Sequence, residues 1–97
     1  MTIKTIPVDT AKYFDTPVSQ IALLNDAFES GDAHYIAHSI GIIARARGMS
    51  KVAAEAGVTR EALYKSLSKD GDPRLTTLLG VVKALGLKLE AHTQDAA

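Results

Sequence analysis

The feature that most constrains the fold is the stretch from Met49 to Leu67, in which two short helical patterns are separated by a single glycine. Gly57 is typical of a helix end, because glycine reaches a positive φ without steric cost, and Thr59 is a typical N-cap. Two helices that cross steeply at short range need a small residue where they approach most closely. Ala53, four residues before the glycine, meets that need. The stretch therefore predicts a helix-turn-helix.

The apolar positions of this stretch predict which side chains face solvent. Those expected in the interior share an apolar side chain at helical spacing: Val52, Ala56, Val58, Leu63 and Leu67. With these positions committed to the core, the second helix presents a polar face: Thr59, Arg60, Glu61, Tyr64 and Lys65. Side chains of these types suit the groove of a DNA duplex.

The chemistry of this face fits contacts to bases. Arg60 can form a bidentate pair with guanine or grip a phosphate, and Glu61 can accept a hydrogen bond from a cytosine amine. Thr59 and Tyr64 offer hydroxyl groups. A tight helical corner with a solvated, charged face would account for the same residue types without any DNA.

Two further places suit contacts to phosphate. Met49, Ser50 and Lys51 form the first turn of the leading helix, whose free backbone N–H groups can bind an anion. Lys69 lies in the loop after the second helix, where its ammonium group can hold a phosphate on the other side of the groove. The sequence thus predicts that both ends of the stretch position it on the DNA backbone.

Apolar residues at helical spacing predict three more helices. One covers about 17–30, one follows the N-cap candidate Asp32 and ends near Gly48, and a strongly apolar one covers about 74–86. The whole chain, 1–97, is therefore expected to form one all-α domain of five helices. The two N-terminal helices fall within 16–48.

The two ends of the chain are expected to be extended. Residues 1–15 read as an arm or short strand. Leu87 to Ala91 alternate between apolar and other residues, which predicts a short C-terminal strand within the end segment 87–97. The last residues read as a frayed tail.

Charge is distributed unevenly along a chain whose net charge is zero. Residues 44–74 carry seven basic against four acidic side chains, whereas residues 1–43 carry two basic against five acidic ones. The five acidic residues are Asp9, Asp15, Asp26, Glu29 and Asp32. A basic middle and an acidic front indicate two surfaces with different partners.

Several function classes find little support. The chain has no cysteine and lacks a secretory signal or an apolar run long enough to span a bilayer, which predicts a soluble cytoplasmic protein without membrane contact. His34 and His38 have metal-ligand spacing but no obvious third ligand, so no metal or other cofactor is expected. Asp70-Gly71-Asp72 is a turn rather than a calcium loop. No nucleophile or phosphate-loop motif occurs, so an enzyme is not expected.

The motifs resemble those of the HigA-like antidotes of toxin-antitoxin addiction modules. The resemblance rests on Arg45 to Ser50, Ala56 to Ser68, Asp70 to Pro73 and Ala84 to Leu89, and it extends from about residue 9 to residue 89. Val58 stands where leucine is commoner, and Asp72 where asparagine is. Asp72 places a negative charge beside the expected DNA face.

The resemblance implies a lambda-repressor-like helical domain that binds its own operator as a dimer and neutralises a small basic toxin of the RelE/ParE class encoded alongside. A homodimer also follows from the need for two half-sites on DNA. The fifth helix and the 87–91 segment are the candidate dimer contacts, although both could simply pack on their own core. The acidic first third, with Tyr13 and Phe14 as apolar anchors, is the candidate toxin surface, although a solvated helix face would carry the same charges.

Two other functions stay open at this point. A phage-type repressor without a toxin would share every DNA-binding feature. A helical protein-interaction adaptor would keep the helical corner only as architecture.

Overall fold

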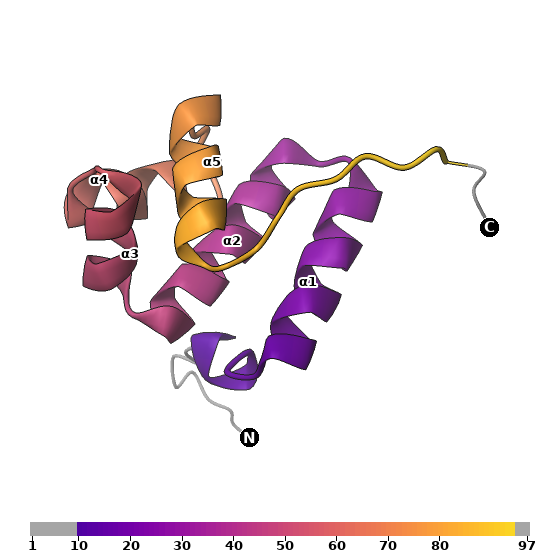
Figure 1. The fold of residues 1–97 in the computed structure, drawn as a ribbon, viewed down its shortest axis with the longest axis horizontal. Coiled ribbons are helices and arrows are strands. Elements are labelled where there is room, and N and C mark those ends of the chain that lie inside the picture. Colours follow the sequence, from indigo (N-terminus) through magenta and orange to yellow (C-terminus); the bar gives the residue numbers. More distant parts are fainter. Residues whose placement is uncertain (1–9, 95–97) are drawn as a thin grey trace, which may run out of the picture.

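The computed structural model describes residues 10–94 of the chain. These residues contain five α-helices and one 3-10 helix (Figure 1). In chain order they are η1 (Thr10–Tyr13), α1 (Pro17–Ser30), α2 (Ala33–Arg47), α3 (Met49–Ala56), α4 (Arg60–Ser66) and α5 (Leu75–Ala84). No strand occurs among these residues, so the all-α class predicted from the sequence is confirmed.

Side-chain caps fix where the first two helices begin. Thr16 and Ser19 form a reciprocal capping box at the start of α1, and Pro17 occupies its first turn. Asp32 caps α2 by accepting hydrogen bonds from the backbone N–H groups of His34 and Tyr35. Each cap is a local feature of the sequence, which is why these two helices start where the sequence predicts.

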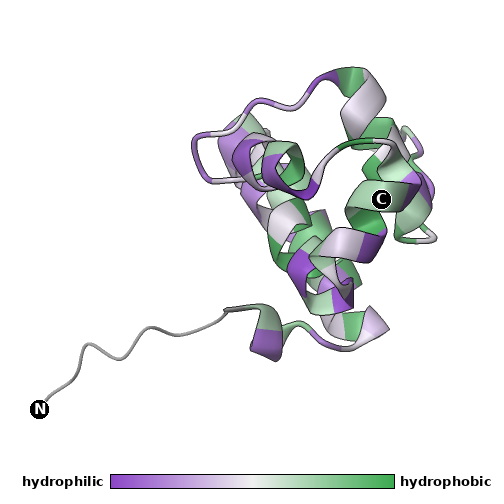
Figure 2. Ribbon diagram, turned by 90° about the vertical axis from the view of Figure 1, so that its left-hand side faces the viewer, coloured by the Kyte–Doolittle hydropathy of each residue, from purple (hydrophilic) through white to green (hydrophobic). Residues whose placement is uncertain are grey.

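Helix α2 is the centre of the core. Ile40 and Ile43 on this helix are almost fully buried and belong to one cluster with Leu24 of α1, Val52 of α3 and Val81 of α5. Hydrophobic and hydrophilic residues are interspersed along the helices (Figure 2), as expected of helices with one buried and one exposed side. Burial of a shared apolar stripe is thus what holds the helices together.

A close approach between α2 and the end of α4 depends on Gly41. A Cβ atom at this position would lie 2.5 Å from the backbone oxygen of Leu67. Backbone atoms cannot swing aside, so a larger residue would force the two elements apart. Gly41 therefore fixes how deeply the end of α4 seats against α2.

A polar junction ties three helices together at the C-terminal end of α2. The guanidinium group of Arg47 donates to Gln20 Oε1 of α1 and to the backbone oxygen of Leu85, just after α5. Gln20 is buried, and its Nε2 donates to the backbone oxygen of Phe14. Both ends of this buried amide are therefore satisfied.

Two predictions about the chain ends are corrected. Within the predicted extended arm of 1–15, Thr10–Tyr13 forms a 3-10 helix, while residues 1–9 lie outside the described part. The predicted strand at 87–91 is not a strand, and no second strand occurs among residues 10–94 with which it could pair. The backbone N–H of Leu87 instead bonds to Val82 in the turn that ends α5.

No helix in residues 10–94 has the length and apolar character needed to cross a membrane.

Candidate nucleic-acid interface

The turn between α3 and α4 is closed by a pair of backbone hydrogen bonds around Gly57. This glycine has φ 78°, and its N–H bonds to the oxygen of Ala54 while the N–H of Val58 bonds to that of Ala53. This is the Schellman pattern of a helix that stops at a left-handed glycine. The turn predicted at this position therefore rests on backbone geometry that favours glycine.

Burial sets the orientation of α4 around its own axis. Ala53 of α3 is buried, as predicted for the point of close approach, and Val58 packs partly buried against the core. Leu63 and Leu67 are almost fully buried on the inner side of α4. The opposite side of this short helix must consequently face solvent.

The outer side of α4 carries the polar residues that the sequence predicts there. These exposed residues are Thr59, Arg60, Glu61, Tyr64 and Lys65. The structure brings them together within one short helix and its cap, at the left edge of the bundle in Figure 1, with no other element labelled beyond α4 on that side. The predicted set therefore forms one contiguous outward face.

Arg60 and Tyr64 form a pair on this face. The guanidinium carbon lies 5.4 Å from the centre of the Tyr64 ring, and Nη2 lies 3.4 Å from the phenol oxygen. A cation over an aromatic face at this distance is attracted to it by about 0.5–1 kcal/mol at an exposed site. This pairing holds two long side chains in place before any ligand binds. The i, i+4 spacing of the two residues could have indicated it.

Thr59 has a structural task in addition to its predicted one. Its hydroxyl oxygen accepts a hydrogen bond from the backbone N–H of Ala62, which caps α4. The hydroxyl hydrogen stays available to donate to an acceptor. Replacing Thr59 would therefore disturb the helix as well as any contact it makes.

Met49 is 5% exposed and belongs to the core cluster. It can contribute to an interface only through its backbone, which is the contact expected from the sequence. Helix α3 begins at Met49, and no side chain caps this end. Ser50 and Lys51 are exposed in this first turn. The phosphate site expected here thus has only backbone N–H groups and these two side chains.

Three lysines on or beside the α3–α4 pair are not engaged in ion pairs within the described part of the chain. None of Lys51, Lys65 and Lys69 forms an ion pair with another described residue. Lys69 is exposed in the loop between α4 and α5, where it was predicted. These ammonium groups are therefore free to attract an anionic ligand.

His34 holds the loop that follows α4. Its Nδ1 lies 3.2 Å from the backbone oxygen of Gly71, so the imidazole can donate across from α2 to this loop. No group of three metal-ligating side chains occurs among residues 10–94. The role that the structure gives His34 is to support the loop that carries Lys69.

A hydrogen bond joins Tyr35 of α2 to the acidic residue Asp26 of α1. The hydroxyl of Tyr35 on α2 donates to the carboxylate of Asp26 on α1. This bond above all, with burial and the nearby negative charge adding to it, raises the pKa of Tyr35 above its ordinary value of 10.0. Asp26 thus has a partner inside the chain.

Comparison with known proteins gives one family and one relative. A family described as "probable addiction module antidote protein" matches residues 4–93. A protein of Haemophilus influenzae, described as uncharacterized, is 37% identical over 84 residues, which cover 87% of each chain. No solved structure matches.

Proposed function

Since the chain belongs to the family of probable addiction module antidote proteins, we propose that it is a HigA-like antidote with two activities. It binds the operator of its own operon through α3 and α4, as a lambda-repressor-like helix-turn-helix protein and a repressor. It also neutralises a small basic toxin of the RelE/ParE class.

The observation that carries the DNA half of this proposal is the outward face of α4. Leu63 and Leu67 anchor the helix, while Arg60, Tyr64 and Lys65 project from its free side. A helix held by its inner side and polar on its outer side has the form that inserts into a major groove.

On DNA, the residues divide by task. Arg60 and Tyr64 approach base edges, where the guanidinium group of Arg60 can pair with guanine. Lys51 and Lys69 lie before and after α4 in the chain and hold phosphates, which positions the helix without reading the sequence. Glu61 and Lys65 extend the polar face on either side.

We expect the chain to bind DNA as a homodimer, because one small module buries too little surface for specific affinity. Leu75 and Leu79 are exposed apolar residues on α5 and are the candidate contact between the two copies. The 87–91 segment, the other candidate contact, forms no strand within one copy, so α5 is the contact that we propose.

Titration of the purified chain against the duplex upstream of its own operon, at two salt concentrations, tests the DNA half. The proposal predicts tighter binding than to a scrambled duplex of equal length, with affinity that falls as salt rises. Equal and weak binding to both duplexes would favour a helical protein-interaction adaptor. Specific DNA binding without any toxin partner would favour a phage-type repressor.

A further inference from the structure

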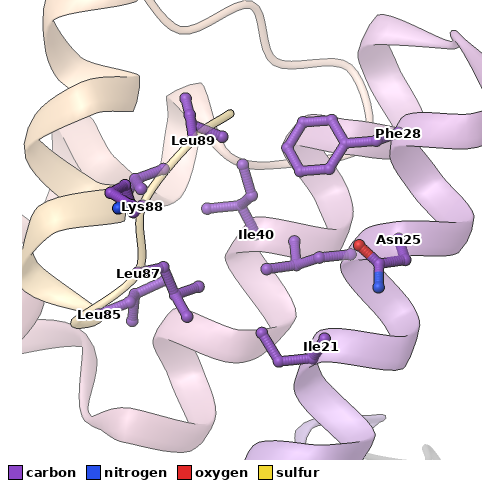
Figure 3. A pocket seen from close by; sticks show the side chains of 10 residues that line it. Ile21, Asn25, Phe28, Ile40, Leu85, Leu87, Lys88 and Leu89 are labelled. Atoms are coloured by element: carbon purple, nitrogen blue, oxygen red, sulfur yellow. The ribbon is translucent and has the colours of Figure 1, made fainter. Parts of the chain in front are cut away.

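An apolar groove runs between α1 and the segment that follows α5. Ile21, Asn25 and Phe28 of α1 form one wall, Leu87 and Leu89 form the other, and α2 closes it from beneath (Figure 3). Helix α1, which forms one wall, lies on the right of the bundle in Figure 1, whereas α4 lies at its left edge. None of the residues proposed to contact DNA lines the groove.

Phe28 is the centre of this apolar surface. It is 40% exposed, and Leu89 across the groove is 41% exposed. Phe28 also lines two adjoining hollows, one beside His92 and one beside Pro73 and Leu78. Single exposed apolar residues are ordinary, but a contiguous set around a groove marks a place where a partner binds.

Helix α1, which forms one wall of the groove, carries two acidic side chains, Asp26 and Glu29, and no lysine or arginine. Residues 13–44 contain four acidic side chains and no lysine or arginine. Glu29, one residue after Phe28, forms no hydrogen bond or ion pair with another described residue. Across the groove, Lys88 also lines the cavity, and its ammonium group is paired with Glu90 at 3.5 Å.

Charge decides between two possible occupants. In a symmetric contact, a second copy would bring the same acidic helix against itself, and like charges facing each other across an interface are unfavourable. A basic protein would place lysine or arginine beside Glu29 and an apolar side chain against Phe28. The charge of α1 therefore favours a basic partner.

We propose that the groove between α1 and residues 87–89 is the docking site for the basic toxin, which inserts an apolar side chain between Phe28 and Leu89. This inference rests on the proposed function and adds the surface that performs half of it. It replaces Tyr13 and Phe14 as the apolar anchors of the toxin contact. Because α4 lies on another side, toxin and operator can be bound at the same time.

The test measures Kd by calorimetry between the intact chain and the small basic protein encoded beside it. Phe28→Ser and Leu89→Ser should each weaken binding about tenfold or more, since truncating a central apolar anchor removes a large part of an interface's affinity. Tyr13→Ser is the matched control, because Tyr13 is 70% exposed and lies outside the groove. It should bind within about twofold of the unaltered chain.

Charge reversal on α1 tests, in the same assay, whether its acidic residues attract the partner. Glu29→Lys should weaken binding and flatten its dependence on salt, while Glu55→Lys on α3 should leave both unchanged. Circular dichroism shows whether each variant is folded. If Phe28→Ser fails to fold, Leu89→Ser on the other wall decides the question alone.

Each contrary result has a distinct meaning. Toxin binding that survives both groove substitutions, or that is lost in Tyr13→Ser instead, would overturn the groove and leave the proposed function standing. Loss of a dimer in sedimentation with unchanged toxin affinity would assign the groove to a second copy. If the unaltered chain does not bind the basic protein at all, the groove proposal and the toxin half of the proposed function both fail.

Discussion

The side chain of Arg47 holds the buried amide of Gln20, with its Nε and Nη2 atoms 3.0 and 2.8 Å from Gln20 Oε1. The same guanidinium donates to the backbone oxygen of Leu85 at 2.9 Å. Arg47 therefore joins α1, α2 and the end of α5 at one point. Two of these elements, α2 and α5, also pack against the α3–α4 pair, so the junction helps to support it.

Arg47→Ala should lower the free energy of unfolding by about 1–3 kcal/mol, because it leaves the buried Gln20 oxygen without its donors. Lys83→Ala, which removes an exposed side chain of α5, is the control and should change stability by less than about 0.5 kcal/mol. Urea denaturation measures both. Equal stability of the two variants would show that the junction contributes nothing.

Two glycine substitutions separate helix propensity from packing. Gly41→Ala and Gly80→Ala both add a methyl group within a helix, and each gains up to about 1 kcal/mol of propensity. At Gly41 the added carbon would lie 2.5 Å from the Leu67 oxygen, whereas at Gly80 the nearest atom is 3.3 Å away.

We therefore expect Gly41→Ala to be destabilised by about 1–3 kcal/mol through overpacking and Gly80→Ala to stay near the stability of the unaltered chain. The midpoints of thermal unfolding compare the two directly. A Gly41→Ala protein as stable as Gly80→Ala would mean that α4 does not seat against α2 as described.

Arg60→Ala should weaken operator binding by about 1–3 kcal/mol and relax preference at the base pair that Arg60 reads. Tyr64→Phe keeps the ring beneath the guanidinium and removes only the hydroxyl, so it should lose less affinity. Competition between operator variants, each altered at one base pair, provides the measurement. Uniform weakening across all variants would reassign Arg60 to phosphate.

Lys69→Ala should weaken binding to all duplexes by a similar factor and reduce the slope of log affinity against log salt by about 1. We expect this effect because the ammonium group of Lys69 is exposed, forms no ion pair with a described residue and can attract a phosphate. Titrations at several salt concentrations give the slope. A slope equal to that of the unaltered chain would exclude a phosphate contact.

Tyr35 should ionise at a pH above the ordinary tyrosine pKa of 10.0 when the protein is titrated with base. The hydrogen bond to Asp26 raises the pKa of Tyr35 in the folded chain above its unfolded value near 10.0. The stability that this bond contributes is therefore complete below about pH 10 and is lost as the pH rises through the folded pKa.

Tyrosinate absorbance follows this titration, and the signal that is lost in Tyr35→Phe identifies the Tyr35 transition. Asp26→Asn, which removes the negative charge, should bring this transition to lower pH. A Tyr35 transition at or below pH 10.0 in the unaltered chain would contradict the hydrogen bond.

Local signals predicted the helices well because each signal acts within a few residues. Thr16, Asp32 and Gly57 cap or end their helices through contacts with neighbours in the chain. The alternation of apolar and other residues at Leu87 to Ala91 gave a wrong prediction of a strand. A strand requires a partner strand, which a local pattern does not supply. The exposed face of α4 was predictable because burial of Leu63 and Leu67 fixes its opposite side.

Contacts between distant residues could not be predicted in the same way. Arg47 looks in the sequence like another basic residue near the DNA face, yet its guanidinium is occupied by Gln20 and Leu85. Burial of the Met49 side chain in the core likewise depends on contacts with distant residues. The groove beside Phe28 exists only because the chain returns past α1 after α5, which no local pattern indicates.

The central claim is that the outward face of α4 contacts the operator, and chemical-shift mapping tests it most directly. On addition of the duplex upstream of the operon to the isotope-labelled chain, the largest changes in backbone amide shifts should fall at residues 59–65, 50–51 and 69. Changes of that size centred on α1, with α4 unaffected, would contradict the account.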